Sequence, residues 1–171
     1  RGLGDVYKRQ GPRRAEVASL TVKDFHTHLG YPSLHFVRKG GEDHTMALNP
    51  QTAQRLQVYL MTAGHREDYD GPLFRPVKGL SRKEPSAGLR RHLDPDLIDK
   101  LVRKYARKAL GVERGYSAHS CRATFGTTAL LKGAGLEDVQ EAMGHADIST
   151  TRLYDRRSSN PERSAAFKVN Y

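Results

Sequence analysis

The apolar positions of this chain follow a helical spacing over most of its length. Between Asn49 and Gly64, apolar residues recur three or four positions apart, which places them on one face of a helix. This face consists of Ala53, Leu56, Leu60 and Ala63. Asn49 and Pro50 are typical of a helix start and Gly64 of a helix end, so the pattern predicts one helix between them.

The same reasoning predicts five further helical segments. They are a short helix over residues 13–20, a helix opened by Asp94 and Pro95, a helix over residues 117–131, a short helix over residues 136–143, and a helix that begins at Asp147 and carries Tyr154. The second of these presents Ile98, Leu101, Val102 and Tyr105 as its apolar face. Gly133, Gly135 and Gly144 lie where the later helices should end.

One segment has the pattern of a β-hairpin instead. In LHFVRKGGEDHTMAL, two extended runs at residues 34–38 and 44–48 flank a Gly40-Gly41 turn, with Lys39 at the tip. The final residues, FKVNY, alternate in character and fit an edge strand. The predicted fold class is therefore mainly α with a small β-hairpin or sheet (α+β).

The composition is that of one compact domain. The 171 residues with 37% hydrophobic content can bury a core, and no apolar run is long enough to span a membrane or resembles an export signal. We therefore expect a cytoplasmic protein without a membrane partner. The single cysteine, Cys121, excludes an internal disulfide and is expected to be a small buried side chain.

The charge balance favours a polyanionic partner. Twenty-nine Lys and Arg stand against nineteen Asp and Glu, a net charge of +10. Residues 64–95 are rich in Gly, Pro and charge, and residues 75–92 alone hold six Lys or Arg against one Glu. This segment is either a loop near DNA or a solvated linker, and the sequence favours neither reading.

The first ten residues, RGLGDVYKRQ, have no apolar period. They equal the in-frame translation of a common tagmentation sequencing adapter, so we interpret residues 1–10 as an assembly artefact and residues 11–171 as the domain. Without residues 1–10 the net charge falls from +10 to +8, so the basic character remains.

The chain contains the residue types needed to break a phosphodiester without a metal. That reaction requires a nucleophile, cations around the non-bridging oxygens and an acid for the leaving oxygen. Tyrosine, arginine and lysine supply these, because the planar guanidinium matches two phosphate oxygens and an ammonium can give up a proton. In AHSCRATF, His119 and Arg122 are three positions apart on one helix face and can reach one phosphate, whereas Cys121 points away from His119.

Four motifs resemble those of the phage integrase and Xer-like tyrosine recombinase family, most closely over residues 118–157. GPRRAE is similar to TGLRISE in the first box, and RKGGEDHTMAL is similar to the hairpin GKGNKERLVPL, with Glu42 at the second family lysine. AHSCRATF resembles HxLRHTFAT, and GHADISTTRLYDRR matches the final box. The site residues that the resemblance assigns are Arg13, Lys39, His119, Arg122, His145 and Tyr154.

The resemblance implies a tyrosine recombinase catalytic-domain fold that is N-terminally truncated, because the one or two helices before the first box and a separate DNA-gripping domain are not expected in residues 11–171. It implies site-specific DNA recombination, for integration or excision, through a 3′-phosphotyrosyl intermediate. Tyr154 would be the nucleophile and Lys39 the general acid, while Arg13, Arg122, His119 and His145 would hold the phosphoryl oxygens. The implied partner is double-stranded DNA, bound by a homotetramer on two duplexes at the nucleoid, with no cofactor, metal or small-molecule substrate.

Three alternatives stay open at this point. Truncation could leave a catalytically weak or inactive DNA-binding fragment with Arg13 poorly held. A type IB topoisomerase shares the chemistry, although the size and the final box favour recombination. A metal site at His26-Thr-His28 lacks a third ligand.

Overall fold

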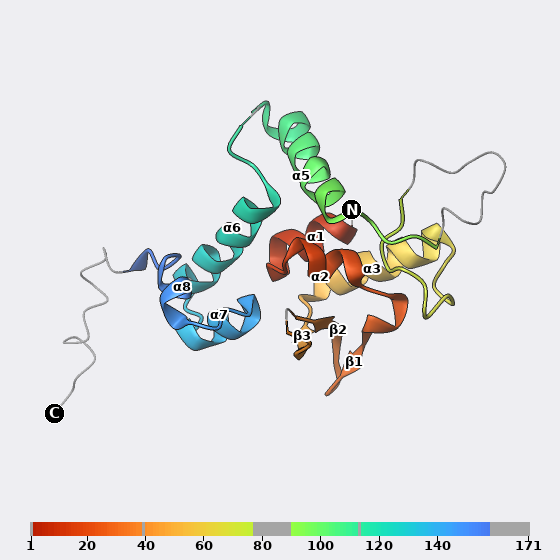
Figure 1. Ribbon diagram of the computed structural model, residues 1–171, viewed down its shortest axis with the longest axis horizontal. Coiled ribbons are helices and arrows are strands. Elements are labelled where there is room, and N and C mark those ends of the chain that lie inside the picture. The colour runs from red at the N-terminus through yellow and green to blue at the C-terminus, as the bar shows by residue number, and fades with distance from the viewer. Residues whose placement is uncertain (1, 39, 77–89, 113, 158–171) are drawn as a thin grey trace.

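A computed structural model describes residues 2–38, 40–76, 90–112 and 114–157 of the chain (Figure 1). The described elements are α1 (Gly2–Gln10), α2 (Arg14–Ser19), the 3-10 helix η1 (Val22–Asp24), β1 (Phe25–His28), β2 (Tyr31–Val37), β3 (Asp43–Ala47), α3 (Pro50–Ala63), α5 (Pro95–Leu110), α6 (Ala118–Leu131), α7 (Leu136–Met143) and α8 (Ile148–Arg152). The sheet lies beside α1, α2 and α3, and α6 leads from them to α7 and α8 (Figure 1). The predicted α+β class is confirmed.

The sheet is antiparallel, in the order β1-β2-β3. The predicted hairpin is confirmed as β2 and β3, while β1 is an additional strand that the apolar pattern did not indicate. Its sequence, FHTH, contains one apolar residue and is mostly exposed, so no alternation marks it. Its place is fixed by pairing, because Phe25 lies opposite Leu34, and Leu34 opposite Met46, on the face that enters the core.

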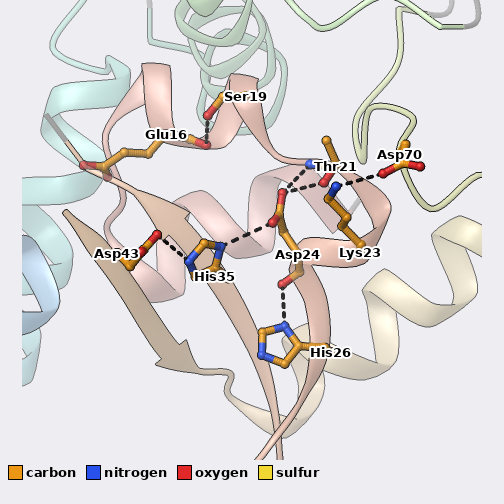
Figure 2. Close-up of polar contacts among 9 residues, drawn as sticks. All are labelled: Glu16, Ser19, Thr21, Lys23, Asp24, His26, His35, Asp43 and Asp70. Carbon is orange, nitrogen blue, oxygen red and sulfur yellow. Dashed lines mark hydrogen bonds and ion pairs between the residues drawn. The ribbon is translucent and has the colours of Figure 1, made fainter. Parts of the chain in front are cut away.

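The other face of the sheet carries a polar network (Figure 2). His35 of β2 lies between two carboxylates, with Nδ1 3.4 Å from Asp24 Oδ1 and Nε2 2.9 Å from Asp43 Oδ1. Asp24 Oδ2 in turn accepts hydrogen bonds of 2.7 Å from both the backbone N–H and the hydroxyl of Thr21. These contacts tie the hairpin to η1 and hold β2 in register with β3.

Two hydrophobic clusters stabilise the described part of the chain. The large core holds eighteen buried apolar side chains from α1 to the start of α6, among them Leu34, Leu56 and Ile98. The small cluster consists of Leu130, Val139 and Met143, with partly buried neighbours that include Phe125 and Tyr154. α6 belongs to both, because Ala118 at its start joins the large core and Leu130 at its end joins the small cluster.

Helix ends agree closely with the predicted caps. Asn49 Oδ1 accepts the N–H of Gln51 at 3.0 Å, and Gly64 ends α3 in the left-handed conformation at φ 68°. Asp94 and Asp147 cap α5 and α8 in the same way as Asn49 caps α3. The short polar side chains therefore set these boundaries, as the sequence predicted.

The segment before the first box differs from our expectation. Residues 2–10 form α1, which packs against α3 and α6, and Val6 and Tyr7 are buried in the large core. The reading of residues 1–10 as a segment without an apolar period was wrong, because Leu3, Val6 and Tyr7 have the i, i+3, i+4 spacing of one helix face and pack together into the large core. The adapter origin of residues 1–10 stays a prediction.

The predicted apolar face of α5 is correct only near its start. Ile98 is fully buried and Leu101 and Val102 are partly buried, but Tyr105 is 62% exposed. α5 packs against α2 and α6, and its later turns extend beyond those contacts. The predicted strand at 167–171 and most of the basic segment 75–92 lie outside the described residues.

Among the described helices, none combines the length and the apolar character that crossing a membrane requires.

Candidate active site

Three arginine side chains from three distant segments converge on the C-terminal turn of α7. Arg13 Nη2 donates to Gly144 O at 2.6 Å, Arg122 Nη2 donates to Met143 O, and Arg38 Nη2 donates to Glu141 O. The last carbonyls of a helix have no partner within it and carry the negative end of the helix dipole. The end of α7 therefore gathers these three guanidinium groups, which we call the arginine cluster.

Glu16 orients Arg13. Its buried carboxylate accepts the Arg13 backbone N–H at 2.6 Å through Oε2 and the Arg13 Nη1 at 2.8 Å through Oε1. The neighbouring Arg14 instead pairs with Asp96 at 2.8 Å on the exposed surface of α5. The geometry thus separates two adjacent arginines that the bare sequence could not rank.

Arg122 lies deepest in the arginine cluster, with 7% of its surface exposed. Its Nη1 donates to Gly11 O, while its Nη2 reaches α7, so one guanidinium links the first box to the last. Burial, and then the charge of Arg13, lower the pKa of Arg122. An arginine still stays charged near neutral pH, because its ordinary pKa lies far above that range.

Gly144 leaves space for the guanidinium groups of Arg13 and Arg38 beside the end of α7. It ends α7 in the left-handed conformation at φ 60°. A Cβ placed on it would lie 2.8 Å from Arg38 Nε and 3.2 Å from Arg13 Nη1. Glycine is therefore required both by the backbone and by two guanidinium groups that pass beside it.

His145 and Tyr154 lie together beside the turn that ends α7. Their rings stack with centroids 5.8 Å apart and an interplanar angle of 18°. Thr151 Oγ1 lies 2.9 Å from His145 Nδ1, and Gln140 Nε2 donates to His145 O at 3.0 Å. These contacts fix the imidazole ring against the phenol.

Tyr154 does not lie on α8 as expected. The helix ends at Arg152, and Tyr154 follows in a turn in which its N–H donates to Thr151 O at 3.0 Å. Its ring is partly buried and packs against the small cluster. The short helix thus presents the tyrosine at its end, next to His145.

The surroundings of His145 keep its imidazole neutral. Burial, followed by the charges of Arg122, Arg13 and Arg38, lowers the pKa of His145 to about 4. Each arginine disfavours a further positive charge nearby. The same excess of positive charge would attract an anion, and a bound anion would raise that pKa.

Comparison with known proteins identifies the chain's relatives. The model of the Phage integrase family matches residues 4–160. This chain belongs to the phage integrase family. The tyrosine recombinase XerC of Rhizobium meliloti is 30% identical over 84% of this chain and 41% of its own length. The tyrosine recombinase XerD of Listeria monocytogenes is 32% identical over 88% of this chain and 47% of its own length. The chain therefore spans less than half of each of these two relatives.

Solved structures of the family share the fold. The XerH site-specific recombinase bound to a palindromic difH substrate matches with a TM-score of 0.70 and 27% identity, over 90% of this chain and 41% of that one. The XerA recombinase matches with a TM-score of 0.72 at 23% identity, over 99% of this chain and 58% of that one. The arrangement of helices around the small sheet is thus that of tyrosine recombinase catalytic domains.

The structure brings together four of the six residues that the family motifs assigned. Arg13, Arg122, His145 and Tyr154 surround the α7 turn. His119 is exposed near the start of α6, and among the described residues its side chain has no hydrogen bond or ion pair. Lys39 lies outside the described residues.

Arg38 is the residue of the arginine cluster that the sequence reading missed. It stands where the family hairpin GKGNKERLVPL has glycine, and it precedes the expected catalytic lysine. Arg38 lies just after the end of a strand, where no apolar or polar periodicity indicates which way a side chain points. The only usable signal was a second basic residue at the hairpin tip, which alone is typical of a solvated turn.

The described residues include no group of three His, Cys, Asp or Glu side chains placed to hold a metal ion. His26 and His28, which the sequence offered as two ligands, are exposed on β1 with ring centroids 6.3 Å apart.

Proposed function

We propose that this chain is the catalytic domain of a site-specific DNA recombinase that cleaves and rejoins strands through Tyr154. The observation that carries the proposal is the joint placement of Tyr154, neutral His145 and the guanidinium groups of Arg13 and Arg122 around the end of α7. An oxygen nucleophile beside preorganised cations is what attack on a phosphodiester requires.

In the proposed reaction, Tyr154 Oη attacks the scissile phosphorus and the bond from phosphorus to the 5′ oxygen breaks. The product is a 3′-phosphotyrosine and a free 5′ hydroxyl. Lys39 supplies the proton that the leaving oxygen takes up. The proton lost by Tyr154 passes to solvent, and Lys39 takes a proton back from solvent, so the step is balanced. Attack by a 5′ hydroxyl of another strand reverses these steps and restores the DNA backbone.

The other groups stabilise charge on the phosphoryl oxygens. Arg13 and Arg122 bind them, and neutral His145 can donate a hydrogen bond from Nε2 when Thr151 is bonded to Nδ1. His119 is assigned the same role from the family motif. Loss of Arg13 or Arg122 should slow cleavage by about 10²- to 10³-fold, as for one oxyanion-hole donor. Loss of Lys39 should slow it by about 10²- to 10⁴-fold, the usual contribution of a general acid.

The proposed partner is double-stranded DNA, bound at the nucleoid by four protomers on two duplexes. The net charge of +10 supports a polyanionic partner. The similar XerH recombinase was solved on its difH substrate, both before and after cleavage. Family membership supports the tetramer, in which each protomer would supply one Tyr154.

The test is covalent trapping on a library of nicked duplexes, resolved on denaturing gels. The chain should give an adduct that Tyr154→Phe lacks, because the variant keeps the ring packing and removes only the nucleophilic oxygen. Tyr105→Phe removes the hydroxyl of an exposed tyrosine on α5 and should retain the adduct. Sequencing the trapped DNA then gives the cleavage site.

Other outcomes would select another function. DNA binding without an adduct would favour the inactive binding fragment. Relaxation of supercoiled DNA without strand exchange would favour the topoisomerase-like activity. An adduct that survives Tyr154→Phe would contradict the assignment of the nucleophile.

A further inference from the structure

We propose that Arg38 is a third phosphate-binding arginine of this site. This inference rests on the proposed function and adds to it a residue that occupies a glycine position of the family hairpin.

The backbone of Arg38 is held firmly at the base of the hairpin turn. Its N–H donates to Glu42 O at 2.8 Å, and its carbonyl accepts the N–H of Gly41 at 3.0 Å. These bonds continue the β2 and β3 pairing by one step beyond Val37 and Asp43. The side chain therefore starts from a defined position and not from a free loop.

From that position the side chain crosses to α7. Arg38 Nη2 donates to Glu141 O, and the guanidinium lies beside Gly144, on the same side as that of Arg13. Both guanidinium groups come within contact distance of one point, the place that a Gly144 Cβ would occupy. Arg38 is thus a full member of the arginine cluster.

No carboxylate among the described residues forms an ion pair with Arg38. Glu16 pairs with Arg13, and Glu16, Glu42 and Glu141 act on Arg38 only as more distant negative charges. The group that Arg38 contacts on α7 is the carbonyl of Glu141, which carries only a partial negative charge. One anion among three guanidinium groups would relieve their mutual repulsion.

The hydrogen-bonding capacity of Arg38 also suits this role. A guanidinium has five N–H donors in a planar fork that matches phosphate oxygens. One nitrogen, Nη2, bonds to α7, which leaves Nε and Nη1 for an anion. The contact with Glu141 would orient the fork, and the remaining donors would bind the oxygen.

The first experiment measures thermal unfolding of the full chain with increasing inorganic phosphate. An anion that binds only the folded state stabilises it by an amount that grows with the anion concentration relative to its Kd. Wild type should rise in Tm with phosphate, and Arg38→Gln should lose most of that rise. Arg14→Gln, which removes an equal charge from the adjacent surface pair with Asp96, should keep it. An unchanged phosphate response in Arg38→Gln would overturn the proposal, and this arm does not depend on any cleavage activity.

The second experiment uses the duplex recovered by trapping, with either a phosphodiester or an uncharged methylphosphonate at the scissile position. On the diester, Arg38→Gln should slow adduct formation by about 10²-fold, the lower end of the range for one lost oxyanion donor. On the methylphosphonate the variant should match wild type, because the oxygen charge that Arg38 binds is gone. Arg38→Lys, which keeps the charge, should recover part of the diester rate.

An equal loss on both substrates would overturn the proposal and assign Arg38 a purely structural role at the hairpin. No loss on either substrate would overturn it as well. If wild type forms no adduct, the proposed function fails while the phosphate titration still decides the role of Arg38.

Discussion

The region around the sheet and the region around α7 are held together in different ways. The first, with β1 to β3 and α1 to α3, contributes most of the eighteen buried side chains of the large core. The second, with α7, α8 and the end of α6, has three buried apolar side chains and several partly buried neighbours. Yet His145 and Tyr154 belong to the second region, and Arg13 and Arg38 come from the first.

The difference indicates how the site is assembled. Hydrophobic burial fixes the sheet region, whereas the α7 region depends on α6 and on guanidinium bonds to the carbonyls of residues 141, 143 and 144. Those bonds are made by charged groups, so a bound anion could compete for them. We therefore expect the α7 region, which carries the nucleophile, to be less stable than the sheet region, which carries two of the cations that hold it.

The largest expected effect comes from removing one leucine from each cluster. Leu130→Ala and Leu56→Ala each create a cavity at a fully buried position and should lower the free energy of unfolding by about 2–5 kcal/mol. Their local consequences should differ. In Leu130→Ala, backbone amides of α7 and α8 should exchange hydrogen faster while β2 stays protected, because the small cluster can open by itself. In Leu56→Ala, protection should fall across the sheet and α3.

Hydrogen exchange measured by mass spectrometry on both variants tests this contrast. A uniform loss of protection in Leu130→Ala would show that the two regions unfold as one unit and would remove the distinction between them.

A smaller effect is expected from placing a methyl group at a helix end. Gly64→Ala and Gly144→Ala both put a side chain on a left-handed residue, at φ 68° and φ 60°, which should cost about 1–2 kcal/mol. Gly64 has open space around its Cβ position, whereas Gly144 faces Arg38 and Arg13. Gly144→Ala should therefore lose more unfolding free energy than Gly64→Ala in urea titrations, and it alone should weaken phosphate binding.

Equal losses in the two glycine variants, with phosphate binding unchanged, would mean that the arginines rearrange freely and that the turn does not set their positions.

The smallest effect is a pH dependence from His145. Its pKa of about 4 in the folded state lies below the ordinary value of 6.5, so between these values the unfolded chain binds a proton that the folded chain does not. The free energy of unfolding should therefore fall as the pH falls from 6.5 towards 4. One titrating group can change it by at most about 1.4 kcal/mol per pH unit. The change should be smaller than this limit, because the His145 ring is only partly buried. Above pH 6.5 this contribution is constant.

Urea unfolding at pH 7 and pH 5 measures the effect, and His145→Gln should lose less stability than wild type over that interval. Inorganic phosphate should reduce the difference, because an anion among the arginines favours the imidazolium. An identical pH dependence in wild type and His145→Gln would show that the cluster does not act on His145.

The sequence predicted most elements because their signals are local. Asn49, Asp94 and Asp147 cap helices with their own side chains, and alternation marks β2 and β3. β1 was missed because FHTH has no alternation. α1 was missed because residues 1–10 were set aside as an artefact, although Leu3, Val6 and Tyr7 lie on one helix face and pack against α3 and α6. Local patterns cannot show a partner that is distant along the chain.

The candidate site likewise has one part that local sequence motifs predicted and another that only the tertiary structure revealed. Family motifs in the sequence assigned Arg13, Arg122, His145 and Tyr154, and the spacing within each motif was enough for that. Only the tertiary structure decided that Arg13 and not Arg14 reaches α7, that Tyr154 follows the end of α8, and that Arg38 joins the arginine cluster. The physical reason is that the sequence determines residue types and local geometry, whereas carbonyls freed at the end of α7 determine where side chains from three distant segments meet.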